Sequence, residues 1–255
     1  MSSHWDFYLA DLEGQPTSFY LNLSLIQQAP LKGYGLLAIV RVPLREPNEL
    51  GMTTTAETMN LFDLEDSIVK IFNKPEETLW VGRTTGNSVR TFYFYNKDQV
   101  EGLVDPHAHF SEKLAQVMAK HEDYDYEAEI FEDVAWETYR DFLYPDPYTM
   151  QELRNRKVLE VLEERGDKME VAREISHWVY FPDVEKANRF AEKVKEEGFT
   201  LRLDPVENGG RYGVQFYRED VPSADRIDEI TFELQKLANA YGGDYDGWET
   251  KIIFG

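Results

Sequence analysis

The chain contains no cysteine, and basic residues are scarce relative to acidic ones. The absence of cysteine excludes disulfide bonds, thiolate chemistry and zinc sites that need a thiolate ligand. The 27 lysine and arginine residues face 48 aspartate and glutamate residues, which gives a net charge of −21. A field of that sign repels phosphate backbones and disfavours direct binding of DNA or RNA. It favours basic partners, although solubility alone is the simpler explanation of the charge.

Long apolar runs are also missing. No stretch approaches the roughly 20 apolar residues needed to cross a bilayer. Residues 1–6 lack the basic and then apolar regions of a signal peptide. We therefore expect a cytoplasmic protein. Its 255 residues are 42% hydrophobic and 14% aromatic, which is sufficient for a packed core in one large domain or two ordinary ones.

Two prolines mark the expected boundary between two domains. Pro145 and Pro147 disfavour helix on both sides. The capping-box pattern from Thr149 to Glu152 then starts a new helix. We predict one domain over residues 1–145 and a second over residues 149–255, joined by a link that is too short for free movement.

The apolar periodicity of the first domain predicts the order β-β-β-α-β-β-α-β. Strands are expected at residues 4–9, 19–25, 35–42, 79–83, 89–95 and 124–131, and helices after Thr54 and around residues 110–118. In the first helix Leu61, Leu64 and Ile68 share one face. Glu65 falls off that face, and we expect it to be solvated.

The second domain is predicted to have the order α-β-α-β-β-α-β, with strands at residues 171–181, 199–206, 212–217 and 248–254. After its leading helix this is the split β-α-β order of ferredoxin-like folds, and the first domain shows the same order from residue 35 onward. We therefore predict an α+β protein with two tandem ferredoxin-like antiparallel sheets, each with helices on one face. The chain would then contain two copies of one topology.

No grouping of residues indicates catalysis. His107 and His109 follow Pro106, which indicates a loop, so the two imidazoles are not predicted to share a face and hold a metal. The glycine-rich stretches at 85–87 and 208–211 lack the Gly-Lys-Ser/Thr of a phosphate loop and are better explained as hairpin turns. We predict that the protein is not an enzyme and holds neither a metal nor a cofactor.

Aromatic residues are numerous, and some could form a stacking face on a sheet. The candidates in the second domain are Trp178, Tyr180, Tyr212, Tyr217, Tyr245 and Trp248. Sheets of this topology bind RNA through such rings, but they need basic residues beside them. The surroundings here are acidic, so core packing and cross-strand pairing are the simpler explanation.

The stretch from Asp244 to Glu249 is dense in polar and aromatic groups. It follows two glycines that end the last helix and precedes an apolar run. Its carboxylates are too few and wrongly spaced for a calcium loop. We predict that Asp244, Asp246 and Glu249 attract a basic protein segment, and that Tyr245 and Trp248 anchor it. The alternative for Trp248 is a core residue that fixes the last strand.

Residues from about 150 to 254 resemble the regulator of ribonuclease E activity B family. The resemblance rests on residues 244–250 at the end of the last helix, with support from residues 158–167 and 181–199. It implies a small acidic α+β protein that binds ribonuclease E and inhibits it, and so alters messenger RNA decay. Members of this family are not enzymes.

Residues 1 to about 145 resemble an uncharacterised domain family that is sometimes fused ahead of the first. The matching pieces are residues 61–66 and 90–95, and the resemblance implies no activity. We therefore expect a non-enzymatic regulator that binds a basic protein segment, with ribonuclease E or another RNA-decay protein as the partner. The alternative is an enzyme or small-molecule binder that uses a cleft between the domains. Binding by an acidic regulator weakens as salt rises, whereas a buried small-molecule site is less sensitive.

Overall fold

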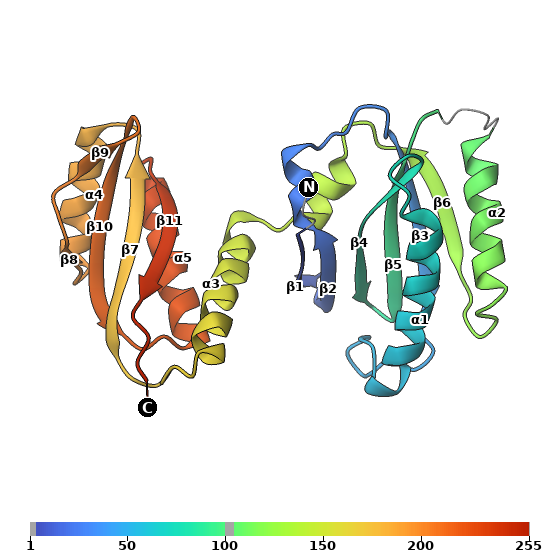
Figure 1. The fold of residues 1–255 in the computed structure, drawn as a ribbon, viewed down its shortest axis with the longest axis horizontal. Helices are drawn as coiled ribbons and strands as arrows, with labels where there is room; N and C mark the ends of the chain where they lie inside the picture. Colours follow the sequence, from blue (N-terminus) through green and yellow to red (C-terminus); the bar gives the residue numbers. More distant parts are fainter. Residues whose placement is uncertain (1–3, 100–104, 255) are drawn as a thin grey trace. The chain divides into compact units, whose positions relative to one another are not determined.

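The computed structural model of the protein describes residues 4–99 and 105–254. The chain divides into two compact units, Met1–Pro145 and Asp146–Gly255, which we call the N-terminal unit and the C-terminal unit. Each unit is built on one antiparallel sheet with helices against it (Figure 1). The predicted α+β class is therefore confirmed.

The N-terminal unit contains a six-stranded sheet with the order β1-β2-β4-β5-β3-β6. Its elements are β1 (Trp5–Leu12), β2 (Gln15–Asn22), the 3-10 helix η1 (Leu23–Gln27), β3 (Leu36–Pro43), α1 (Thr55–Phe72), β4 (Thr78–Gly86), β5 (Val89–Asn96), α2 (Pro106–Met118), β6 (Glu127–Glu132) and the π-helix η2 (Thr138–Leu143). From β3 onward the order of strands across the sheet is fourth, first, third, second, as in ferredoxin-like folds. The hairpin of β1 and β2 extends the sheet beyond β4.

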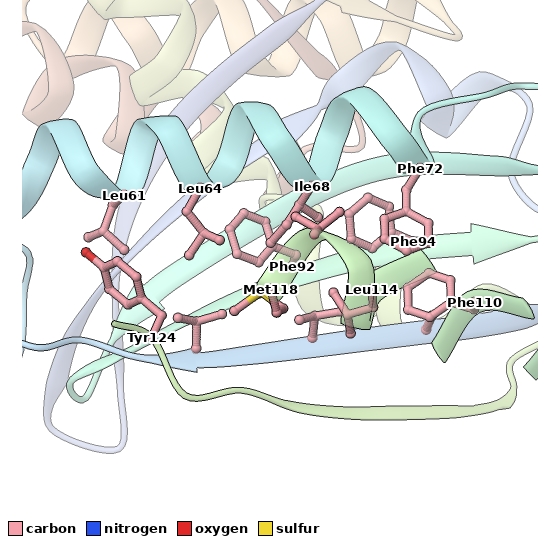
Figure 2. Packing of buried hydrophobic residues seen from close by; sticks show 14 of the residues in the cluster. Leu61, Leu64, Ile68, Phe72, Phe92, Phe94, Phe110, Leu114, Met118 and Tyr124 are labelled. Carbon is pink, nitrogen blue, oxygen red and sulfur yellow. The ribbon is translucent and has the colours of Figure 1, made fainter. Parts of the chain in front are cut away.

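The main core of the N-terminal unit lies between the sheet and the helices α1 and α2 (Figure 2). The predicted stripe of α1 is buried there, and Phe72 continues it to the end of the helix. Phe92 and Phe94 of β5 point into the same layer, and Phe110 of α2 stacks on Phe72 with ring centroids 4.2 Å apart. Burial of these large rings on one face of the sheet stabilises the unit.

The opposite face of the same sheet is covered by the segment that includes η2. Tyr95 alternates with Phe94 along β5 and therefore points to this second face. Its hydroxyl donates to Asp133 Oδ2 at 2.6 Å, and its ring stacks on the fully buried Trp136 at 3.9 Å. Tyr139, also fully buried, donates from its hydroxyl to the carbonyl oxygen of Asn22. The sheet of the N-terminal unit is thus covered on both faces in this region.

The C-terminal unit repeats the topology. Its elements are α3 (Pro147–Glu164), β7 (Arg173–Phe181), α4 (Val184–Glu196), β8 (Thr200–Leu201), β9 (Val206–Asn208), β10 (Arg211–Asp220), α5 (Ala224–Ala240) and β11 (Asp244–Thr250). The sheet order is β11-β7-β10-β8, again fourth, first, third, second, with β9 paired to β10. The prediction of two tandem ferredoxin-like sheets is confirmed.

The helices α4 and α5 cover one face of this second sheet (Figure 1). Val179 of β7, Phe216 of β10, Phe190 of α4 and Leu234 of α5 meet in the core between them. The helix α3 precedes the repeated topology and packs against α5. Within the C-terminal unit, none of the described helices covers the opposite face of the sheet, which is the main difference from the N-terminal unit.

Two predicted strands of the C-terminal unit differ from the observed ones. The last strand was expected over residues 248–254, but β11 covers Asp244–Thr250. The acidic residues at the start of this stretch are typical of a turn, which is why the strand was predicted to begin later. However, β11 is an edge strand, and charged side chains are tolerated there because the outward residues are solvated. The region 199–206 was expected to be one strand, but only Thr200–Leu201 and the start of β9 pair with β10.

Glu65 of α1 is not solvated as expected. Only 7% of its surface is exposed, and its Oε2 lies 2.6 Å from Arg83 Nε and 3.2 Å from Arg90 Nη1. Its burial raises the pKa of the carboxyl, and the two arginines oppose that shift. Helical periodicity places Glu65 beside the apolar face, where a long side chain reaches charged partners on the sheet.

The substitution Glu65→Gln is expected to destabilise the N-terminal unit by about 3–5 kcal/mol, because it leaves two poorly solvated guanidinium groups without their counter-charge. The matched control is Asp66→Asn, which removes the same charge from the exposed neighbour and should cost less than about 0.5 kcal/mol. Urea unfolding followed by tryptophan fluorescence measures both. Equal effects of the two substitutions would contradict the structural role of Glu65.

Candidate functional site

The strand β11 brings the predicted site residues to the edge of the second sheet. Gly242, with φ +73°, ends α5, and Gly243 lies so close to Phe181 that a Cβ would be 2.3 Å from that ring. β11 then pairs with β7, and the register shifts between Tyr245 and Gly247. This β-bulge lets Tyr245 and Trp248, three residues apart, face the same side of the sheet.

Trp248 is a core residue, which decides the alternative that the sequence left open. Its side chain is 8% exposed, and its Nε1 donates to Asn155 Oδ1 at 2.8 Å. Asn155 of α3 is fully buried, and its Nδ2 donates to Asp228 Oδ1 and Thr231 Oγ1 of α5 at 2.8 and 2.7 Å. The indole thus links β11 to both helices.

Tyr245 is buried as well, with 7% of its surface exposed. Its hydroxyl lies 2.9 Å from Nδ1 of the fully buried His177. Burial raises the pKa of Tyr245 well above its usual value. Burial, assisted by the nearby Arg218, lowers the pKa of His177 to about 3. Neither Tyr245 nor Trp248 is exposed to a partner, which corrects the expectation that these rings anchor one.

The three acidic residues of the predicted site are all exposed. Asp244 pairs with Tyr180 across the strands and forms an ion pair with Arg211 of β10. Glu249 pairs with Ser176, so it lies on the same side as Asp244, opposite α4 and α5. Asp246 lies at the bulge. The structure therefore separates the predicted carboxylates, which face solvent, from the predicted rings, which face the core.

The uncovered face of the sheet carries partly exposed aromatic side chains. Trp178 and Tyr180 of β7 alternate with the buried residues of that strand, and Tyr217 of β10 lies on the same side. Arg211 lies over the Tyr180 ring at 5.5 Å, and Arg202 lies over the Tyr217 ring at 4.6 Å. We use the name open sheet face for the surface formed by Trp178, Tyr180, Tyr217, Arg202 and Arg211, with Asp244 and Glu249 at its rim.

This composition is typical of protein-binding surfaces, where tryptophan, tyrosine and arginine contribute most of the binding energy. Three of the six aromatic candidates named from the sequence, Trp178, Tyr180 and Tyr217, lie on this face. The other three, Tyr212, Tyr245 and Trp248, pack against the core instead. The sequence pattern missed Arg202 and Arg211, because neither belongs to a motif and their contact with the rings is set by the pairing of the strands.

The loop predicted at Pro106 is wrong, because His107 and His109 lie in the first turn of the helix α2. Pro106 begins α2, and Asp105 Oδ1 accepts from the backbone nitrogens of His107 and Ala108 as the helix cap. Over residues 4–99 and 105–254, no group of three or more metal-binding side chains comes together. In the same ranges, none of the helices is both long and apolar enough to span a bilayer.

Comparison with known families follows the division into two units. Residues 3–144, more than half of the chain, match the family model described as Family of unknown function (DUF695). The chain belongs to this family. Residues 152–250 of this DUF695-family chain match a second model, described as Regulator of ribonuclease activity B. Both resemblances seen in the sequence are confirmed, and the second model covers most of the C-terminal unit.

No curated protein matches the DUF695-family chain. A solved structure assigned as a glycine cleavage system transcriptional repressor resembles it with a TM-score of 0.24 and 8% sequence identity. The match covers 85% of this chain and 98% of that one. At such a TM-score the similarity carries no argument about function.

The stability of the C-terminal unit is expected to fall as the pH is lowered from 6.5 towards about 3. Over this range the unfolded chain binds a proton at His177 and the folded chain does not, which costs about 1.4 kcal/mol per pH unit. His177→Gln removes this contribution and should make the pH dependence shallower. Urea unfolding at several pH values, followed by the NMR signals of β7, measures it.

The matched control is His121→Gln, which alters a partly exposed histidine of the N-terminal unit. It should leave unchanged the pH dependence of the unfolding free energy that the NMR signals of β7 report. Parallel stability curves for the native chain and His177→Gln would show that the buried imidazole does not titrate as the structure implies.

Proposed function

We propose that this DUF695-family chain is a non-enzymatic regulator that binds ribonuclease E through its C-terminal unit and lowers its activity. The observation that carries the proposal is the match of residues 152–250 to the Regulator of ribonuclease activity B model. The open sheet face supports it, because this face combines aromatic, arginine and carboxylate groups on a surface that no described helix of the C-terminal unit covers.

The contact would combine two kinds of side chain. Asp246 and Glu249, together with Asp244 beside its ion-pair partner Arg211, supply negative charge for a basic segment of the partner. The net charge of −21 extends that field over the molecule. Long-range attraction of this kind raises the rate of encounter more than the final affinity. Trp178 and Tyr180 then supply the apolar contact area that holds the bound partner.

The buried residues of the motif have a positioning role in this proposal. Tyr245 and Trp248 fix β11 through His177 and Asn155, and the bulge between them turns Asp246 to solvent. The order of inward rings and outward carboxylates along β11 is therefore a consequence of one irregularity in the strand. A partner meets the carboxylates, and the rings keep them in place.

Trp178→Ala is expected to weaken binding to ribonuclease E about 30-fold, because truncation of a central interface tryptophan costs about 2 kcal/mol. Titration of the chain against RNA cleavage by ribonuclease E measures the loss of inhibition. The matched control is Trp5→Ala, which removes a half-buried tryptophan from the N-terminal unit. The proposed anchor is wrong if both variants inhibit as the native chain does while circular dichroism shows both to be folded.

The triple variant Asp244→Asn, Asp246→Asn and Glu249→Gln is expected to bind about tenfold more slowly and to show a weaker dependence on salt. Stopped-flow association with ribonuclease E at low and high salt gives both quantities. A control with the same change of net charge alters three exposed acids of the N-terminal unit, Asp11, Glu13 and Glu49. If the two triple variants associate equally slowly, the net charge of the chain sets the association rate, and the position of the carboxylates on β11 has no effect.

A further inference from the structure

A groove lies between α3 and α5, on residues that the proposed function does not use. Its volume is about 240 Å³, which is several times the space of a water molecule. We call it the α3–α5 groove, and the lining residues that matter here are Tyr148, Gln151 and Glu152 of α3 with Asp228, Phe232 and Glu233 of α5.

The wall of the groove contains a buried hydrogen-bond acceptor without a donor. An indole nitrogen can only donate, so the bond from Trp248 fixes the Asn155 oxygen as the atom that faces it. Gln151 Nε2 donates to that same oxygen at 2.9 Å, which fixes the Gln151 amide in turn. Gln151 is 4% exposed, and its Oε1 has no hydrogen-bond partner among the described residues. An unsatisfied buried acceptor costs free energy that a donor from a ligand would recover.

The groove also carries surplus negative charge. Partial burial raises the pKa of Glu152, and the neighbouring carboxylates of Asp228 and Asp146 raise it further. Asp228 accepts from Asn155 through one oxygen, Oδ1. Glu229, at the edge of the groove, does not add to this surplus charge, because Arg226 Nη1 lies 2.6 Å from its carboxylate and forms an ion pair with it. The remaining carboxylates favour a cation, because like charges close together destabilise one another.

Aromatic rings form the rest of the groove. Tyr148 and Phe232 lie with their ring centroids 4.4 Å apart, and 42% of the Phe232 surface is exposed. The face of an aromatic ring attracts a cation, and a planar cation stacks on it with large contact area.

We propose that the α3–α5 groove binds an arginine side chain of a basic protein segment. A guanidinium group is planar, always charged and weakly hydrated, and it has five N–H donors and no acceptor. The groove offers it the Glu152 and Asp228 carboxylates and the exposed ring of Phe232, and it is also lined by Gln151, whose buried Oε1 has no partner among the described residues. The proposal adds a second contact site to the proposed function, and it stands without that function because the groove recognises the side chain by itself.

The test uses the full-length chain labelled with ¹⁵N and three blocked peptides, Gly-Arg-Gly, Gly-Lys-Gly and Gly-citrulline-Gly. The arginine peptide should shift the Gln151 side-chain amide signals along a saturable curve. The lysine peptide should bind several-fold more weakly, because a compact ammonium neither stacks nor forms the bidentate contact. The citrulline peptide keeps the shape without the charge and should not bind detectably. Equal binding of all three would overturn the proposal.

The double variant Glu152→Gln and Asp228→Asn should reduce affinity for the arginine peptide about tenfold, as expected for the loss of two partly exposed charge contacts. Asp228→Asn retains an oxygen that accepts from Asn155, so the buried network remains. The matched control is Glu163→Gln with Glu164→Gln, which removes two charges from the far end of the same helix and should bind as the native chain does. If both double variants lose affinity equally, the effect is that of net charge and the groove is not the site.

Spermidine is the competing cation. If spermidine shifts the same signals and binds more tightly than the arginine peptide, the groove is a polyamine site and the proposal is wrong. Failure of the chain to bind ribonuclease E, with arginine binding intact, would overturn the proposed function and leave this inference in place.

Discussion

The indole of Trp248 donates a hydrogen bond to the buried side chain of Asn155, and the arrangement of the C-terminal unit depends on that contact. Asn155 accepts from Trp248 and Gln151 and donates to Asp228 and Thr231, so one amide joins β11, α3 and α5. Loss of any partner would leave a polar group unsatisfied in the core, at a cost of about 1–3 kcal/mol. The network holds α3 against α5 and β11, and it fixes the orientation of the Gln151 amide.

The two units share one strand order but differ in what covers the second face of the sheet. The N-terminal sheet has helices on one face and the segment containing η2, with the fully buried Trp136 and Tyr139, on the other. In the described part of the C-terminal unit nothing equivalent covers the face of Trp178 and Tyr180. An uncovered sheet face with half-exposed rings is typical of binding surfaces, and the carboxylates of β11 are the basis of our proposal that the partner is basic.

The order of strands and helices was predictable because strand alternation and helical periodicity identify each element separately, and the ferredoxin-like order follows from their succession. Three features were not predictable, because they arise from contacts. Glu65 is buried by two arginines of the sheet, which a helical pattern does not reveal. The bulge in β11 reverses the alternation between Tyr245 and Trp248, so a count along the strand gives the wrong face for one of them. Gln151 and Asn155 are polar and resemble solvated helix residues, although the helix α3 buries both.

Hydroxyl-radical footprinting of the chain, free and mixed with ribonuclease E, tests the central claim most directly, because it measures the solvent exposure of individual side chains. The account predicts that Trp178, Tyr180 and Tyr217 lose reactivity in the mixture, while the buried Trp248 is unreactive in both states. Unchanged reactivity of the open sheet face, with protection confined to aromatic residues of the N-terminal unit, would contradict it.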